Sequence, residues 1–385
     1  MRFTTKALKN QFLKTCEQLH DGQLTVRTPE GERFQFGDKG PEAELIIRDW
    51  AAVSASAAHG QVGLGEGYVH GLWDTPSVEG LMTLFMNNRD QLAAYDHSGP
   101  FTRAKFRLVD TILRANSRRG SKKNISAHYD VGNEFYALWL DEGMTYSSGI
   151  FQEGDEDLGR AQTRKNARAL SRLTEGERTL EIGCGWGGFA EQASADGRHV
   201  TGVTISRNQH SYAECRLDGR ADIQLKDYRD LNGTYDNIVS IEMIEAVGER
   251  YWPSYFGTLK RNLAEGGRGL IQAITVRDDF FETYRKSSDY IRQHVFPGGM
   301  LLSDQVIKTQ AENAGLTVRD NFAFGQDYAK TCRMWAERLS DQKQRISELG
   351  YGEGFFRNWQ YYLEICAASF AVGHTNVVQV ELAHA

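Results

Sequence analysis

The stretch TLEIGCGWGGF, residues 179–189, decides the fold of this chain. A short apolar strand runs into a turn that contains four glycines, and residues 189–193 then have the composition of a helix. Glycine accepts a positive φ and lets a ligand approach the backbone closely. A strand that ends in such a turn, at the N-terminus of a helix, is typical of a site for a nucleotide-type cofactor.

The glycine spacing alone fits more than one cofactor. Gly183, Gly185 and Gly188 match the dinucleotide fingerprint G-x-G-x-x-G, which requires an acid after the next strand to hold the ribose. The next expected strand, residues 199–204, is followed by no acid, whereas Glu181 stands before the first glycine. This E-x-G-x-G turn favours S-adenosylmethionine (SAM) over NAD. An NAD-dependent oxidoreductase and a purely structural glycine turn are the alternatives at this point.

Strand and helix patterns alternate after residue 179, which predicts a doubly wound α/β sheet. The ligand of such a sheet lies beyond the carboxyl ends of its strands. An aromatic-rich segment at 278–300 predicts an inserted helical element that covers an apolar substrate, with core packing as the alternative. The tail, about 340–385, has helical and aromatic character. The expected strands are 179–182, 199–204, 223–226, 236–241 and 267–275, and the expected helices lie near 187–195, 207–217 and 250–263.

The bulk composition is typical of a soluble protein of one or two domains. The chain has 385 residues, of which 40% are hydrophobic and 25% are charged. A net charge of −6 argues against a general nucleic-acid binder. There is no apolar run of transmembrane length, and the N-terminus lacks the pattern of a signal peptide. The five cysteines form no C-x-x-C pair, so we expect no metal site and a reducing, cytoplasmic location.

Residues 1–120 are expected to form a separate N-terminal α+β domain. The segment 22–36 alternates around a Pro-Glu-Gly turn and predicts a β-hairpin, and 43–50 predicts another strand. The segment 66–74 is rich in glycine and aromatic residues and is interpreted as an ordered loop. Ser77 is the expected N-cap of the helix that follows.

A basic amphipathic segment at 101–119 ends this domain. Apolar side chains recur at helical spacing on one face, and Asp110 is the only acid among many arginines and lysines. Such a helix can lie on an anionic membrane surface, although a connector helix with a solvated basic face gives the same pattern. We therefore expect 1–120 to associate with lipid or a membrane, and 121–385 to form the catalytic domain.

Eight blocks of sequence follow one another in a fixed order: HYDVGN (128–133), MTYS (144–147), EIGCGWGG (181–188), VTISRNQ (203–209), DYRD (227–230), EMIEAVG (242–248), YIRQHVFPGG (290–299) and FGQDY (324–328). Together they resemble the family of cyclopropane-fatty-acyl-phospholipid synthases and mycolic-acid methyltransferases. The resemblance covers about 125–335 and is specific. The first hundred residues resemble, more weakly, the extra domain of the bacterial phospholipid-acting members. The resemblance implies a Rossmann-like, class I SAM-methyltransferase fold.

The resemblance also implies the cofactor site. By motif, Gly183 and Gly185 approach the methionine part of SAM. Thr204 and Gln209 hold the ribose side, where the glutamine replaces the acid of the dinucleotide fingerprint. The other residues implied in SAM binding are Tyr146 and Ser147, which close over the cofactor, and Asp227 and Tyr228, which flank the adenine.

In this family the base is a bound bicarbonate, held by a glutamate, a tyrosine, a histidine, a cysteine and a backbone amide. Glu245 and Tyr328 match the glutamate and the tyrosine. Ser148 stands at the cysteine position and Gln272 at the histidine position. Serine and glutamine can hydrogen-bond an anion, but neither titrates near neutral pH as histidine does. This altered bicarbonate site leaves SAM binding intact and puts ring closure in question.

The family alkylates the double bond of an unsaturated acyl chain, usually in a membrane phospholipid. Methyl transfer leaves a carbocation, which aromatic faces can stabilise, and loss of a proton then gives a cyclopropane or a methylated alkene. With the altered site, we expect a methyl-branched or methylated unsaturated product, for example a furan-fatty-acid precursor. An ordinary cyclopropane synthase is the first alternative. A non-catalytic lipid-binding relative and a small-molecule SAM methyltransferase are the others.

The resemblance bears on assembly and location as well. Members of the family often form homodimers through added N-terminal elements, so a homodimer is one expectation here. Because the expected substrate lies in the membrane and the chain shows no spanning segment, we expect a cytoplasmic protein that binds the inner face of the membrane peripherally.

Overall fold

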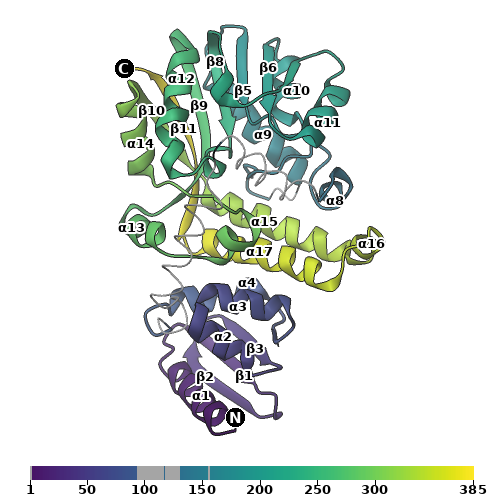
Figure 1. Ribbon diagram of the computed structural model, residues 1–385, viewed down its shortest axis with the longest axis vertical. Helices are drawn as coiled ribbons and strands as arrows, with labels where there is room; N and C mark the ends of the chain where they lie inside the picture. The colour runs from purple at the N-terminus through teal and green to yellow at the C-terminus, as the bar shows by residue number, and fades with distance from the viewer. Residues whose placement is uncertain (1, 93–116, 118–130, 155–156) are drawn as a thin grey trace.

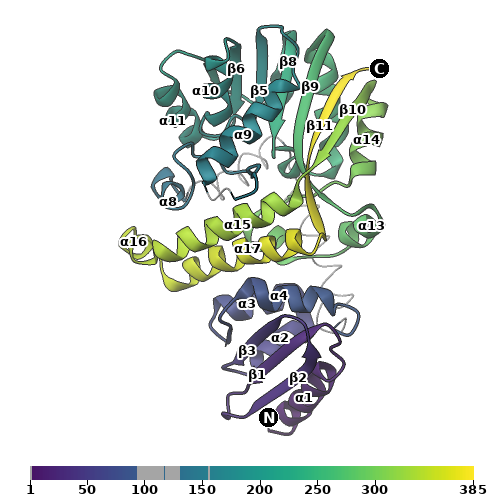
Figure 2. The ribbon, with the colours of Figure 1, turned by 180° about the vertical axis from the view of Figure 1, so that it is seen from behind.

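The computed structural model describes residues 2–92, 117, 131–154 and 157–385. The described chain is arranged in three parts (Figures 1 and 2). A seven-stranded sheet flanked by helices forms one end, and a four-stranded sheet with its own helices forms the other. Two long helices lie across the middle and separate the two sheets.

The seven-stranded sheet has the order β10-β11-β9-β8-β5-β6-β7. Neighbouring strands from β9 through β7 are parallel, whereas β11 runs antiparallel to both β9 and β10. The chain order reverses at β5, and the carboxyl end of that strand is where doubly wound sheets bind their ligands. The predicted Rossmann-like fold is therefore confirmed. The strands are β5 (Arg178–Ile182), β6 (His199–Thr204), β7 (Asp222–Leu225), β8 (Tyr235–Ile241), β9 (Leu263–Val276), β10 (Leu316–Ala323) and β11 (Thr375–His384).

Helices flank this sheet, and several begin at residues with a local capping signal. The side chains of Asp157, Ser206 and Ser303 accept hydrogen bonds from backbone N–H groups in the first turn of the helix that each precedes. These helices are α9 (Leu158–Ser171), α10 (Gly188–Ala195), α11 (Arg207–Leu217), α12 (Trp252–Asn262) and α14 (Asp304–Asn313).

The middle layer consists of α15 (Gly325–Asp341) and α17 (Glu353–Ala371), joined through α16 (Lys343–Glu348). The short α8 (Asn133–Ala137) packs against them through aromatic rings. The fully buried Trp139 is central, with ring centroids 5.6 Å from Trp335 and 5.7 Å from Trp359. Such edge-to-face and tilted pairs stabilise a core beyond the area they bury.

The prediction for the tail is right for the helices and wrong for the last ten residues. Residues 375–384 form β11, which lies between β9 and β10 in the centre of that half of the sheet. All of its residues from Val377 to Ala383 are buried. The strand forms because both neighbours offer backbone hydrogen bonds, and these neighbours are distant in sequence.

The N-terminal α+β domain has a sheet of order β2-β1-β3-β4. The predicted hairpin is confirmed, since β1 pairs antiparallel with β2, and Ser77 caps α4 by accepting a hydrogen bond from Gly80 N. The loop predicted at 66–74 is wrong in its first half, because α3 extends to Val69. The elements are α1 (Arg2–Cys16), β1 (Gly22–Arg27), β2 (Arg33–Lys39), β3 (Glu42–Ile47), α2 (Ala51–His59), α3 (Gln61–Val69), β4 (Trp73–Asp74) and α4 (Val78–Asn87).

The N-terminal domain packs on α17 and on the inserted segment. The glycines of α3 permit this contact: a Cβ built on Gly65 would lie 2.3 Å from the ring of Tyr290 and 2.7 Å from that of Tyr361. Polar contacts add to the interface, including an ion pair of 2.7 Å between Arg333 and Glu79. This close approach explains why a glycine-rich helix occurs where the sequence suggests a loop.

The helical element predicted at 278–300 is confirmed. It contains α13 (Asp278–Lys286) and a short π-helical turn, Ile291–Val295. The basic segment 101–119 and the domain boundary at 120 lie outside the described residues, Ser117 excepted. Within the part of the chain that the structure describes, no helix is long and apolar enough to span a bilayer.

Candidate active site

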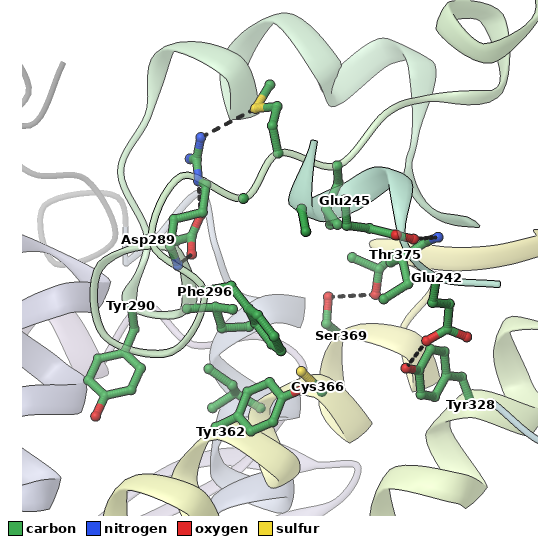
Figure 3. A pocket seen from close by; sticks show the side chains of 18 of the residues that line it. Glu242, Glu245, Asp289, Tyr290, Phe296, Tyr328, Tyr362, Cys366, Ser369 and Thr375 are labelled. Carbon is green, nitrogen blue, oxygen red and sulfur yellow. Dashed lines mark hydrogen bonds and ion pairs between the residues drawn. The ribbon is translucent and has the colours of Figure 1, made fainter. Parts of the chain in front are cut away.

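A cavity of about 510 Å³ lies at the carboxyl ends of β5, β6 and β8. All eight residues predicted to bind SAM line it, and so do Glu245 and Tyr328. The inserted segment and α17 also contribute to its wall, through residues that include Phe296, Tyr362 and Cys366 (Figure 3). The fold therefore brings the predicted cofactor residues together around one space.

The glycine turn follows β5 directly. Gly183 and Gly185 have φ values of 83° and 53°, which favour glycine. The backbone N–H groups of Gly183 and Cys184 donate to the carbonyl of Val203 on β6, at 2.9 and 3.1 Å, so the turn is fixed against the neighbouring strand. Beneath it, burial raises the pKa of Glu181 to about 8, and its Oε2 has no hydrogen-bond partner among the residues that the structure describes.

The expected ribose side is built by a local network after β6. The Thr204 hydroxyl donates to Gln209 Oε1 at 3.0 Å, which orients the glutamine amide beside the cavity. On the expected adenine side, the ring of Tyr228 packs edge-on against Tyr255 at 5.8 Å. Asp227 pairs with the guanidinium of Arg229 and caps the turn that follows. Its carboxylate is thus oriented by its neighbour rather than by a distant element.

The loop that carries Tyr146 and Ser147 is held from both sides. The Tyr146 hydroxyl donates to the Tyr362 hydroxyl at 3.0 Å, and the ammonium of Lys165 donates to Ser147 Oγ at 3.1 Å. Lys165 is almost completely buried, and this burial lowers its pKa to about 8. Lys165 could not be identified from the sequence, because a lysine in an Arg- and Lys-rich helix gives no sign of being buried.

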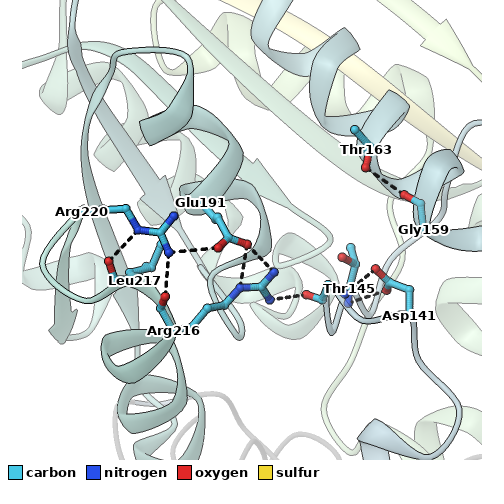
Figure 4. A network of polar contacts seen from close by, with 9 residues as sticks. Asp141, Thr145, Gly159, Thr163, Glu191, Arg216, Leu217 and Arg220 are labelled. Carbon is cyan, nitrogen blue, oxygen red and sulfur yellow. Dashed lines mark hydrogen bonds and ion pairs between the residues drawn. The ribbon is translucent and has the colours of Figure 1, made fainter.

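Figure 4 shows how the same loop is attached to the Rossmann helices. Arg216 of α11 forms a two-pronged contact with Glu191 Oε2 of α10, at 2.9 and 2.6 Å, and donates to the carbonyl of Gly143 at 2.7 Å. Asp141 accepts from the backbone N–H groups of Gly143 and Thr145, each at 2.9 Å. The position of Tyr146 and Ser147 therefore depends on α10, the helix that begins at the glycine turn.

We expect Gly185→Ala to lower the affinity for S-adenosylhomocysteine by about tenfold or more. A Cβ built on Gly185 would lie more than 4 Å from every described protein atom beyond its two chain neighbours and would point into open space at the cavity wall. The added methyl group would therefore collide with a bound ligand and not with the protein. Isothermal titration calorimetry measures the change. Gly197→Ala is the matched control, since Gly197 also has a positive φ, 85°, and open space around it but does not line the cavity. Both variants should lose about 1–2 kcal/mol of stability, and equal loss of affinity in both would contradict the assignment.

The predicted base site is organised around Glu242, which the sequence analysis did not select. Three donors converge on its carboxylate: the backbone N–H of Ser148 at 2.9 Å, Gln272 Nε2 at 2.7 Å and the hydroxyl of Tyr328 at 2.5 Å. Glu242 lines the cavity directly after β8, with a φ of 48°, and Figure 3 shows its contact with Tyr328. Three of the positions expected to hold a bicarbonate thus hold a carboxylate of the chain itself.

Ser148 and Gln272 differ in how they contribute. Both side chains are fully buried behind Glu242, and neither lines the cavity. The Ser148 hydroxyl donates to the carbonyl of Gly149 at 3.0 Å and does not point to an anion. Only the backbone N–H of Ser148 binds an anionic group, the carboxylate of Glu242. The reason is local, since the neighbouring carbonyl is within reach of the short side chain.

A chain of side chains fixes the orientation of the Gln272 amide. Arg168 donates to Gln379 Oε1 at 2.6 Å, and Gln379 Nε2 donates to Gln272 Oε1 at 3.0 Å. The amide nitrogen of Gln272 must therefore face Glu242. Gln379 lies on β11, the strand that the sequence analysis missed, so this support for the site could not be predicted without the correct tail.

Glu245 occupies a separate position on the cavity wall. Its Oε1 accepts from Ile274 N at 2.5 Å, and within the described part of the chain its buried Oε2 has no hydrogen-bond partner. Burial, and then the charge of Glu242, raise the pKa of Glu245 to about 8. Burial also raises the pKa of Glu242, but three donors oppose that rise. The three donors favour the charged form of Glu242, whereas Glu245, which has one backbone donor and the charge of Glu242 beside it, favours its protonated form.

A signal for Glu242 was present in the sequence. It stands directly after a buried strand at the carboxyl edge of a doubly wound sheet, where ligands bind. It also lies in a block, EMIEAVG, of which only the second acid was matched to a family residue. An acid at such a strand end was itself a candidate, independent of any match.

Comparisons with known proteins agree with this site. The family model for mycolic acid cyclopropane synthetase matches residues 116–380. The tuberculostearic acid methyltransferase UfaA1 of Mycobacterium tuberculosis is 36% identical, over 97% of this chain and 90% of its own. The cyclopropane-fatty-acyl-phospholipid synthase of Escherichia coli K12 is 33% identical, over 83% of this chain and 82% of its own.

A solved structure has the same fold over the catalytic part. It is the mycolic acid cyclopropane synthase CmaA1 complexed with SAH and CTAB, which superimposes with a TM-score of 0.64 and 28% identity, over 68% of this chain and 97% of that one. The matched model spans well over half of the chain and two relatives exceed 30% identity across most of it. The chain belongs to the cyclopropane and mycolic acid synthase family and is a SAM-dependent methyltransferase.

Proposed function

We propose that this enzyme transfers a methyl group from SAM to the double bond of an unsaturated fatty acyl chain, and that Glu242 takes the place of bicarbonate as the base. The observation that carries the proposal is the convergence of Ser148 N–H, Gln272 and Tyr328 on the Glu242 carboxylate at the cavity wall. The name of the relative UfaA1, a tuberculostearic acid methyltransferase, supports a methyl-branched product.

The residues of the cavity fit SAM. Gly183 and Gly185 leave the turn open to a close ligand, and the orphaned, buried oxygen of Glu181 suits a cationic group such as the ammonium of the methionine part. Thr204 and Gln209 would hold the ribose side. When bound, SAM supplies an electrophilic methyl group.

The other side chains position the alkene, exclude water and accept a proton. The π pair of the alkene would form the bond to the methyl carbon as the bond from that carbon to the sulfonium sulfur breaks, which would leave S-adenosylhomocysteine and a cation on the neighbouring carbon of the chain. The aromatic faces of Tyr328, Tyr362 and Phe296 line the cavity and stabilise that charge. Glu242 then accepts a proton. Removal from the added methyl closes a cyclopropane ring, whereas removal from a neighbouring carbon gives a methylated alkene.

We infer that the product is a methyl-branched or methylated unsaturated chain, for which a furan-fatty-acid precursor is one example. Ser148 N–H, Gln272 and Tyr328 hold the Glu242 carboxylate in one position, and we propose that this position favours removal of a proton from a neighbouring carbon over removal from the added methyl. An ordinary cyclopropane synthase is the second candidate. It is favoured by the presence of Glu245 and Tyr328, which match the glutamate and the tyrosine of the family pattern, and by the Escherichia coli relative.

The decisive experiment is mass spectrometry of lipids from a host that lacks its own cyclopropane synthase and is fed labelled methionine. We expect a labelled chain that is heavier by one methylene and keeps a double bond. The same mass as a ring that resists hydrogenation would assign the cyclopropane reaction. No labelled lipid, from mono- or diunsaturated chains, would overturn the proposal and favour a non-catalytic lipid-binding protein.

The role of Glu242 in place of bicarbonate has its own test. The purified enzyme is assayed in buffer freed of carbon dioxide and again with added bicarbonate. We expect equal rates, because the base is part of the chain. A rate that rises with bicarbonate would return that role to a bound ion.

We also propose that the substrate is a membrane phospholipid and that the protein binds the inner membrane face peripherally, in the cytoplasm. The basic segment 101–119 and the names of the phospholipid-acting relatives support this. A homodimer formed through the N-terminal domain would suit such binding. Vesicle flotation with and without anionic lipid, and sedimentation of the full chain, test the two points.

A further inference from the structure

The cavity does not end at the catalytic carboxylates but continues between the two domains and into the N-terminal one. Its lining includes Tyr362 and Cys366 of α17 together with Met82, Phe85 and Met86 on α4. The cavity wall then includes residues of β3 and α2. One continuous space therefore joins the two domains, although they have separate sheets.

The part of this space that the N-terminal domain lines is mainly apolar, with Ser56 and Gln61 as its uncharged polar side chains. Its wall includes Leu45 and Ile47 from β3, Val53 from α2, and the three α4 residues Met82, Phe85 and Met86. Among the lining residues within 2–92, Arg89 alone is charged, and its guanidinium lies over the ring of Phe280 at 4.4 Å. Away from Arg89, a charged ligand group in this part of the cavity would lose its hydration without a charged partner.

We infer that the N-terminal domain holds the methyl-terminal part of the acyl chain whose double bond is alkylated at Glu242. This inference rests on the proposed function, because it takes its ligand from it. The identity of the occupant follows from two observations: the cavity is continuous with the catalytic site, and this part of it is lined mainly by Leu, Ile, Val, Met and Phe side chains. An unbranched hydrocarbon tail can extend from the catalytic site into such a space. Methionine suits such a role, since its flexible side chain adapts to a mobile apolar chain.

The subsite gives the N-terminal domain a role in substrate choice. A chain that extends far beyond its double bond would fill the subsite and gain apolar contact, and a short one would not. The contact at Gly65, where α3 meets Tyr290 and Tyr361, keeps the two halves of the wall together. The domain is then part of the binding site and not only an attachment to the membrane.

Photolabelling of the full-length protein tests the inference directly. The probe is free oleic acid that carries a diazirine near its methyl end, and labelled peptides are mapped by mass spectrometry. We expect labels within 45–53 and 82–86. Labels confined to the catalytic domain would overturn the subsite. Labels that appear on exposed residues of the N-terminal domain, and only with phosphatidylglycerol vesicles, would also overturn it and assign the domain to membrane docking.

A variant pair tests the effect on specificity. Met86→Trp should reduce labelling of 45–53 and lower kcat/KM for long acyl chains about tenfold relative to short ones. Asp90→Trp is the control, because Asp90 is exposed, follows α4 and does not line the cavity. Equal chain-length profiles in the two variants would contradict the subsite. Labelling needs no turnover, so labels at 45–53 without methyl transfer would refute the proposed function while supporting the subsite.

Discussion

Glu242→Gln is expected to lower kcat by about 10²- to 10⁴-fold, the usual contribution of a general base. The substitution preserves the geometry. A glutamine oxygen can accept from Ser148 N–H and Gln272, and its amide can donate to the Tyr328 oxygen, which also accepts hydrogen bonds. What disappears is the negative charge that accepts the proton. The measurement is single-turnover transfer of labelled methyl groups to lipid.

The affinity for S-adenosylhomocysteine is the control for this variant, and we expect it to stay near the wild-type value. Glu245→Gln should lose less activity at pH 7, because the glutamine resembles the protonated form that Glu245 already has there. A kcat for Glu242→Gln within a factor of about three of wild type would remove Glu242 from the mechanism, since loss of a base costs far more.

Glu245→Gln is expected to flatten the dependence of stability on pH. In the folded protein the pKa of Glu245 is raised from 4.5 to about 8, so the folded state keeps a proton that the unfolded state has already lost between these values. The free energy of unfolding therefore has its full value below about pH 4.5 and falls as the pH rises to about 8. Each pKa unit is worth about 1.4 kcal/mol, so the effect amounts to a few kcal/mol.

The measurement is urea unfolding of wild type and variant at several pH values from 4.5 to 8. As the pH rises, the free energy of unfolding of wild type should fall relative to that of Glu245→Gln. Any change in stability that the new amide group itself brings is the same at every pH, so it does not alter this trend. Glu142→Gln is the control, because Glu142 is exposed and its carboxyl group is hydrated in both states. A constant difference between wild type and Glu245→Gln across this range would mean that Glu245 is ionised in the folded protein.

The order of strands and helices from 179 to 275 could be predicted because its signals are local. Apolar runs bounded by glycines define the strands, and Ser206 and Ser77 cap their helices through hydrogen bonds to residues three positions away. The glycine turn belongs to the same class, since positive φ values at Gly183 and Gly185 are a property of these residues themselves.

The base site depended on contacts that no local pattern contains. Glu242 receives donors from residues 94, 30 and 86 positions away, and the support for Gln272 comes from Gln379, 107 positions away. The resemblance to a family supplied Tyr328, Ser148 and Gln272 as positions. It could not show that a carboxylate of the chain lies between them.

The sequence by itself determined the doubly wound sheet, the glycine turn and the class of cofactor, because neighbouring residues set strand, turn and helix. Only the tertiary structure decided that residues 375–384 form the strand β11, that residues 66–69 belong to a helix, and that Glu242 is the carboxylate held at the base site. Each of these three depends on partners far along the chain, which become neighbours only when the sheets and helices pack.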